Sequence, residues 1–285
     1  MKFSLTACVL ALAIALPAHA NSAVRGDEGI GFYIGIDGQA TLASGTFAGQ
    51  ANPNAGRLTW LLDHGDHYHG IGTYSYTGTA AAPVVMPTNA NNRLPEPSSR
   101  VNDATSAIAL QAGTGAWSGS WVSQVLPAGA PAHAYSLLGA ASTQSLNGLS
   151  PDADVLFNSS GGRWSGSASG VTVALKLESV TAGLKVAAGG NADIFAGGVG
   201  SLWVLGDFET LAFDPVFHVD GQAAPGVYSA QFSLVNLGSN TAVGNGGTFS
   251  YDFAVAAPVP EPSGLALMLA GLLGVGLLAR RRLPR

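Results

Sequence analysis

Three histidines fall within six consecutive positions of this sequence, a density that is typical of metal ligands. The stretch 63–70 reads DHGDHYHG. Neutral imidazole is a good ligand for zinc, copper and nickel, and a tetrahedral zinc site needs three or four nitrogen, sulfur or carboxylate donors. The alternative interpretation is a polar loop whose histidines are only solvated. We interpret the stretch as a candidate site for a metal ion, with zinc as the expected cofactor and these candidate ligands: His64, His67, His69 and Asp66.

The elements around this stretch decide whether the three imidazoles converge. Apolar residues at 58–62 predict a short strand that leads into it, and residues 71–77 predict a strand that leaves it. Side chains alternate between the two faces of an extended chain, so His67 and His69 share one face and His64 takes the other. His64 joins them only if Gly65 permits a turn or bulge.

A fourth histidine, His218, stands about 150 residues downstream, two positions before Asp220. Donors from one short segment rarely close a tetrahedral shell, whereas a β-sandwich brings distant strand ends together at one edge. We therefore expect His218 to complete the metal site, with Asp220 as a ligand or as an orienting partner. The alternative is a lone surface histidine beside a turn.

The first 20 residues predict a secretory signal peptide. Lys2 precedes an apolar run, and the segment ends in the small-residue pattern Ala18-His19-Ala20. Cys8, the only cysteine, lies within this segment. A chain cleaved near Asn21 would have no thiol and no disulfide, so its metal chemistry would use nitrogen and oxygen ligands.

The last 28 residues, 258–285, combine a short acidic motif, an uncharged apolar run and an arginine cluster. The run at 263–279 has about the minimum length for a membrane-spanning helix, and the arginines would hold its end in the cytoplasm. The order closely resembles the PEP-CTERM sorting signal of Gram-negative bacteria. That resemblance implies recognition by an exosortase, removal of the helix, and release or attachment at the cell surface. The residues that carry it are Pro260, Glu261, Pro262, Arg280, Arg281 and Arg282.

The region between these ends is acidic. From Asn21 to Pro260 the sequence holds 16 Asp plus Glu and seven Lys plus Arg, so the formal charge is 7 − 16 = −9. Nucleic-acid binding requires cationic groups against phosphate, so this balance argues against a nucleic-acid partner. Residues 21–257 are enough for one large β domain or two small ones.

Alternating apolar and polar residues predict strands, not helices, through residues 21–257. The clearest examples are 171–177, 228–234 and 248–255. Residues 30–36 predict a further strand, with 40–47 returning as its partner, and 79–99 predict a long loop that is either a lid over the histidines or a surface excursion. We expect an all-β ectodomain, a β-sandwich of Greek-key or jelly-roll type, between the signal peptide and the C-terminal sorting helix.

Several of these segments together resemble the PEP-CTERM proteins that are repressed by the zinc-uptake regulator Zur. The resemblance implies an exported, non-enzymatic zinc-binding protein of the cell surface or extracellular matrix, which captures zinc or passes it to zinc-uptake components. The residues that carry it are His64-Gly-Asp66-His67-Tyr-His69 with Gly72-Thr-Tyr74, Asn92-Arg93-Leu94-Pro95, and Phe217-His218-Val-Asp220 ahead of Pro225-Gly226-Val-Tyr228.

Two other functions stay open on the sequence. One is a structural surface or matrix protein that needs no metal. The other is a metallohydrolase, since three histidines and a water also make a catalytic zinc site. The chain lacks both the His-x-His-x-Asp-His and the His-Glu-x-x-His order.

Overall fold

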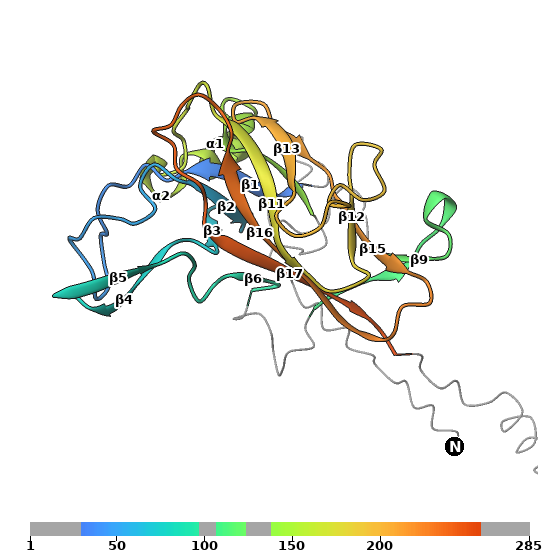
Figure 1. Ribbon diagram of the computed structural model, residues 1–285. Coiled ribbons are helices and arrows are strands. Elements are labelled where there is room, and N and C mark those ends of the chain that lie inside the picture. Colours follow the sequence, from blue (N-terminus) through green and yellow to red (C-terminus); the bar gives the residue numbers. More distant parts are fainter. Residues whose placement is uncertain (1–29, 97–106, 124–137, 258–285) are drawn as a thin grey trace, which may run out of the picture.

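The computed structural model describes residues 30–96, 107–123 and 138–257 (Figure 1). The predicted signal peptide (1–20) and sorting segment (258–285) lie outside these residues. No helix within the three described ranges is long and apolar enough to cross a membrane. The described chain is predominantly β, with several sheets and only short helices, which confirms the predicted all-β class at that level.

One large sheet has five strands in the order β14-β10-β1-β2-β3. The strand predicted at 30–36 is β1, but residues 40–47 do not return as its partner. Its neighbours are β2, which is antiparallel, and β10, which is parallel and comes from a distant part of the chain. The bounds are β1 Ile30–Ile36, β2 Leu58–Asp63, β3 Tyr68–Ile71, β10 Gly139–Ser142 and β14 Ala212–Phe213.

The second large sheet has the order β13-β11-β16-β17-β6, and β7 also pairs with β17. Its three long strands are the ones that alternation predicts most clearly. On β17 the apolar residues Phe249, Phe253 and Val255 are all buried. The bounds are β6 Arg93–Leu94, β7 Ile108–Ala109, β11 Thr172–Val180, β13 Leu202–Asp207, β16 Gly226–Asn236 and β17 Thr248–Val255.

Two smaller sheets complete the β structure. One has the order β12-β15-β9-β8, and the other is the hairpin β4-β5. β5 and β6 fall within the segment 79–99 that the sequence predicted as a loop, so that prediction was wrong for these two strands. The bounds are β4 Ser75–Thr79, β5 Ala82–Met86, β8 Gln111–Ala112, β9 Ser120–Val122, β12 Lys185–Ala187 and β15 Val216–Asp220.

The helices are short and lie outside the strands. α1 (Pro151–Phe157) was not predicted from the sequence, although its start carries the usual signals of a helix. Ser150 caps it by accepting a hydrogen bond from the Ala153 N–H, and a proline follows at the first helical position. The others are the 3-10 helices η3 (Gly115–Trp117) and η4 (Thr143–Leu146) and the irregular turn α2 (Ser159–Gly162).

The two large sheets pack on each other through aromatic side chains. Trp60 of β2 stacks on Phe249 of β17 with ring centroids 4.9 Å apart, and Phe32 of β1 meets Tyr251 edge to face at 5.5 Å. The opposite face of the five-stranded sheet is covered as well, since Leu61 packs in a second core with Leu156 of α1. Burial on both faces explains why β2 is almost continuously apolar.

Candidate metal centre

The histidine stretch forms the tip of the β2–β3 hairpin. The last paired residues are Asp63 and Tyr68, and the His64 N–H donates to the His67 carbonyl oxygen at 3.0 Å. Gly65 has φ +91°, a conformation that residues with a Cβ rarely adopt, and its N–H donates to Asp63 Oδ1 at 2.6 Å. The turn that the sequence required at Gly65 is therefore confirmed.

The turn brings the three imidazoles together, and we refer to His64, His67 and His69 as the histidine cluster. One potential ligand atom from each histidine lies within 4.8 Å of those of the others. The His64 and His69 rings stack with centroids 3.7 Å apart. Tyr68 points to the opposite face, where its ring meets Tyr33 in the second core at 5.7 Å. Strand alternation thus directs His67 and His69 to one side while Tyr68 anchors the hairpin on the other, and the turn at Gly65 brings His64 to them.

A buried carboxylate, Glu96, joins two of these histidines. Glu96 Oε2 lies 3.1 Å from His64 Nε2, and Oε1 lies 2.7 Å from His69 Nδ1. The Asn91 side-chain amide donates to Oε1 as well. The Glu96 side chain is only 3% exposed. Burial alone would raise the pKa of this carboxyl, but the hydrogen bonds from His64, Asn91 and His69 outweigh it and lower the pKa to about 2. Glu96 is therefore ionised at any physiological pH.

Glu96 was not among the site residues predicted from the sequence. One signal could have found it, since Glu96 is the only acidic residue between Asp66 and Asp103. The acid lies 27 positions after His69, however, and local spacing gives no indication that the two meet.

Glu96 reaches the histidine cluster from the other large sheet. It follows β6, which pairs with β17, whereas the cluster belongs to the hairpin of the five-stranded sheet. The two sheets approach closely here. The Gly72 N–H donates to the Asn91 carbonyl at 2.8 Å, and a Cβ at Gly72 would lie 2.1 Å from the Thr248 carbonyl oxygen. The centre is therefore a junction between the sheets.

A second carboxylate, Asp66, contacts the third histidine. Its Oδ1 lies 2.7 Å from His67 Nδ1, and this hydrogen bond, followed by the charge of His67, lowers the pKa of Asp66. Asp66 is 80% exposed at its side chain. In this arrangement it orients an imidazole from outside the cluster, in contrast with the direct ligand role that the sequence suggested.

These contacts fix which nitrogen of His67 and His69 is available to a metal. An ionised carboxylate only accepts hydrogen bonds, so Nδ1 of each histidine carries the proton and Nε2 of the neutral ring carries a lone pair. The two Nε2 atoms face each other at 3.2 Å. Two nitrogens on one tetrahedral zinc ion, at about 2.0–2.1 Å from it, would be about 3.3 Å apart. The spacing therefore suits a shared cation.

His218 and Asp220 do not join this group. His218 lies on β15 between β12 and β9, and its Nε2 is 2.8 Å from the Ala192 carbonyl oxygen. Figure 1 shows β15 and β9 at the right of the molecule and β3 to the left. Asp220 accepts a hydrogen bond from the Gln222 N–H at 2.8 Å in its own turn. The group of potential ligand atoms found among the described residues holds only the three cluster histidines, so the expectation that strand ends would bring His218 and Asp220 to the cluster is corrected: the pairing of β15 with β12 and β9 places His218 beside Ala192 instead.

The geometry defines a class of site: three clustered imidazoles, each in contact with a carboxylate, that could hold a metal ion. Comparisons of the chain with family models, with curated proteins and with solved structures gave no match. The chemistry of the centre is thus the basis for any functional conclusion.

Proposed function

We propose that this protein binds zinc through the histidine cluster and captures zinc or hands it on when zinc is scarce. The observation that carries the proposal is the pair of imidazole Nε2 atoms at 3.2 Å, each on a ring whose Nδ1 is engaged by a carboxylate. Two facing lone pairs repel each other unless a proton or a metal ion lies between them. Carboxylate contacts of this kind fix the tautomer and raise the basicity of metal-binding histidines.

The donor set suits zinc, as it suits the other divalent metals that imidazole binds. The described chain contributes nitrogen donors without thiolates, so ligands that favour Cu(I) or iron–sulfur clusters are not involved. The three side chains are 22%, 48% and 38% exposed for His64, His67 and His69. A metal bound there would be open to an incoming ligand, which suits exchange with a partner. The charge of −9 over residues 21–260 would also raise the local concentration of cations.

Export and sorting are proposed from the two ends of the sequence. The segment 1–20 would direct secretion, and the Pro260-Glu261-Pro262 motif with its apolar run and arginines would be read by an exosortase. The protein would then act at the cell envelope, the cell surface or in the extracellular matrix, with zinc-uptake components as receiving partners. We further propose that the two large sheets are the halves of a β-sandwich, and that the protein is not an enzyme.

A structural protein without metal is the second candidate, and one observation favours it. Glu96 is buried and hydrogen-bonded to two histidines and to Asn91, so this network could serve only to hold the two sheets together. In that case the histidines would act as hydrogen-bond donors and not as ligands.

Metal content separates the two candidates. The purified full-length chain would be loaded with zinc, dialysed and analysed for bound metal, beside a variant in which the three cluster histidines are alanine. About one zinc per chain in the wild type and none in the variant supports the proposal. Equal metal content in both proteins overturns it, and loss of stability without any change in metal content would favour the structural role.

A further inference from the structure

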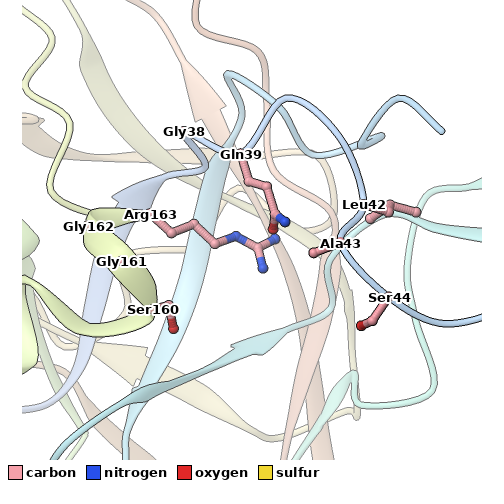
Figure 2. A pocket seen from close by; sticks show the side chains of 9 residues that line it. All are labelled: Gly38, Gln39, Leu42, Ala43, Ser44, Ser160, Gly161, Gly162 and Arg163. Carbon is pink, nitrogen blue, oxygen red and sulfur yellow. The ribbon is translucent and has the colours of Figure 1, made fainter. Parts of the chain in front are cut away.

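A cavity that is open to solvent lies beside the end of β1, and none of its lining residues belongs to the candidate metal centre. Its volume is about 570 Å³. Figure 2 shows the segment after β1 on one side and α2 with Arg163 on the other, and the Arg163 head extends into the space between them beside the Gln39 side chain. The residues that line the cavity are Gly38, Gln39, Leu42, Ala43, Ser44, Ser160, Gly161, Gly162 and Arg163.

Arg163 is held rigidly by a buried acid. Its Nε donates to Asp37 Oδ1 at 2.8 Å, and its Nη2 donates to Asp37 Oδ2. The guanidinium also lies 4.5 Å over the ring of Trp164. Asp37 is fully buried and accepts two more hydrogen bonds, from the Gln39 N–H and the Asn52 amide, both at 2.9 Å. The charge of Asp37 is therefore shared among several donors.

This arrangement leaves half of the guanidinium available to a ligand. Arg has five N–H donors, and two of them point to Asp37, so three remain. One on Nη2 and one on Nη1 lie parallel, which is the fork that pairs with both oxygens of a carboxylate. The side chain is 28% exposed, and Arg163 is the only charged residue among the described residues that line the cavity.

The rest of the lining offers neutral hydrogen-bonding groups and a small apolar wall. Gln39, Ser44 and Ser160 supply an amide and two hydroxyls, and Leu42 and Ala43 supply the apolar side. Ser160 has φ +55° and is the only non-glycine residue with a positive φ in the described ranges. Residues held in such conformations cluster at binding sites, where the surrounding structure imposes them.

We propose that this cavity binds a small hydroxylated carboxylate of about the size of a sugar acid. The carboxylate would pair with the Arg163 fork, and the ligand's hydroxyls would meet Gln39 and the serines. A cavity of 570 Å³ is far larger than a bare acetate ion needs and lies within the usual range for small-molecule sites. The inference is independent of zinc binding, because none of the lining residues belongs to the metal centre.

Calorimetric titration of the full-length chain with glucuronate tests the proposal, with glucose as the matched neutral ligand. The protein should carry the three histidine-to-alanine changes, so that zinc cannot bridge to the sugar acid. Saturable binding of glucuronate and much weaker binding of glucose are expected. A parallel titration with a glucuronate-containing oligosaccharide identifies the source. If the oligosaccharide binds more tightly, the natural ligand is a polymer. If the two ligands bind equally, the natural ligand is the free acid. Both outcomes support the site.

Variants locate the binding. Arg163→Lys keeps the charge but loses the fork, and should weaken glucuronate binding roughly tenfold to a hundredfold. Arg57→Lys is the matched control, since Arg57 also lies over an aromatic ring, 4.4 Å from Tyr74, but outside the cavity. Ala43→Trp fills the cavity without disturbing Asp37, so it keeps the test valid if Arg163→Lys fails to fold. Ser160→Gly should weaken binding without lowering the melting temperature, because glycine accepts the positive φ.

Three results would overturn the proposal. The first is no saturable binding of glucuronate by the parent protein. The second is equal affinity for glucose, which would remove the role of the carboxylate. The third is unchanged binding in Ala43→Trp, which would place the ligand elsewhere.

Discussion

Glu96→Gln is the sharpest test of the metal centre, because it removes one charge from a carboxylate that supports two of the three histidines. The glutamine side chain would have the same shape, but its NH₂ group would face one imidazole where an acceptor oxygen stands now. That ring must then change its tautomer or lose the hydrogen bond. Loss of such an orienting partner typically weakens metal binding 10–100-fold, and since two rings depend on Glu96 we expect a value near the upper end, about 100-fold.

The same substitution should destabilise the zinc-free protein. The amide resembles a protonated Glu96, and the pKa of this carboxyl is lowered from 4.5 to about 2 in the folded chain. At about 1.4 kcal/mol for each pH unit between the two values, the ionised form contributes on the order of 3 kcal/mol at neutral pH. Urea unfolding without zinc measures this loss. A hundredfold weaker affinity would separately remove about 2 to 3 kcal/mol of zinc-dependent stabilisation.

Two matched variants make the comparison specific. Asp66→Asn removes the carboxylate of His67, but this side chain is 80% exposed and water can replace it, so a loss of about tenfold or less is expected. Glu178→Gln also removes one charge, from an acid that bonds Ser233 and Lys176 and no histidine. It should leave zinc affinity unchanged. Affinities would come from competition with a chromophoric zinc chelator near neutral pH.

The reasoning is refuted if Glu96→Gln binds zinc as tightly as the wild type. It is also refuted if Asp66→Asn loses more zinc affinity than Glu96→Gln. The exposed carboxylate would then orient the histidines more effectively than the buried one.

Replacing the whole histidine cluster with alanine should abolish zinc binding, and an unchanged zinc stoichiometry would exclude these ligands. Zinc affinity should fall as the pH drops below about 6.5, where free imidazole takes up a proton; binding that stays flat to about pH 5 would indicate carboxylate-only coordination. Because the pKa of Glu96 is lowered on folding, its contribution to the zinc-free stability should be complete above pH 4.5 and should disappear as the pH falls toward 2, which acid titration of the unfolding free energy measures. His218→Ala should leave zinc affinity unchanged and cost about 1 kcal/mol of stability through the lost bond to Ala192, so weaker zinc binding would restore His218 to the site. In a native host the processed chain should lack residues 264–285, and intact arginine tails in surface material would contradict exosortase processing.

The spacing of apolar residues in the sequence predicted the strands whose side chains are buried in that same pattern. Alternation at 228–234 and 248–255 corresponds to β16 and β17, and the apolar run at 58–62 corresponds to β2. Which strands pair with one another was harder to predict from the sequence. The expected partner of β1 at 40–47 was wrong because β1 pairs instead with β2 and with β10, and β10 lies more than 100 residues away in the sequence. Which strands pair depends on the packing of the whole core, and that information is not contained in any short window.

The histidines and the carboxylate of the candidate metal centre differ in the same way in how far the sequence predicts them. The convergence of the histidine cluster depends on alternation and on the conformational freedom of Gly65, which are both properties of six consecutive residues. The sequence therefore predicted it on the condition of a turn at Gly65, which the structure has. Glu96 reaches the cluster only because Leu94 pairs with Tyr251 of β17 while β2 packs its Trp60 against Phe249 of the same strand. The position of the carboxylate thus depends on how the two sheets pack. His218 fails for the corresponding reason, since β15 pairs with β9 and β12 in a different sheet. Local rules can therefore nominate imidazole ligands from a hairpin, whereas the groups that orient those ligands are set by tertiary contacts between strands that are distant in sequence.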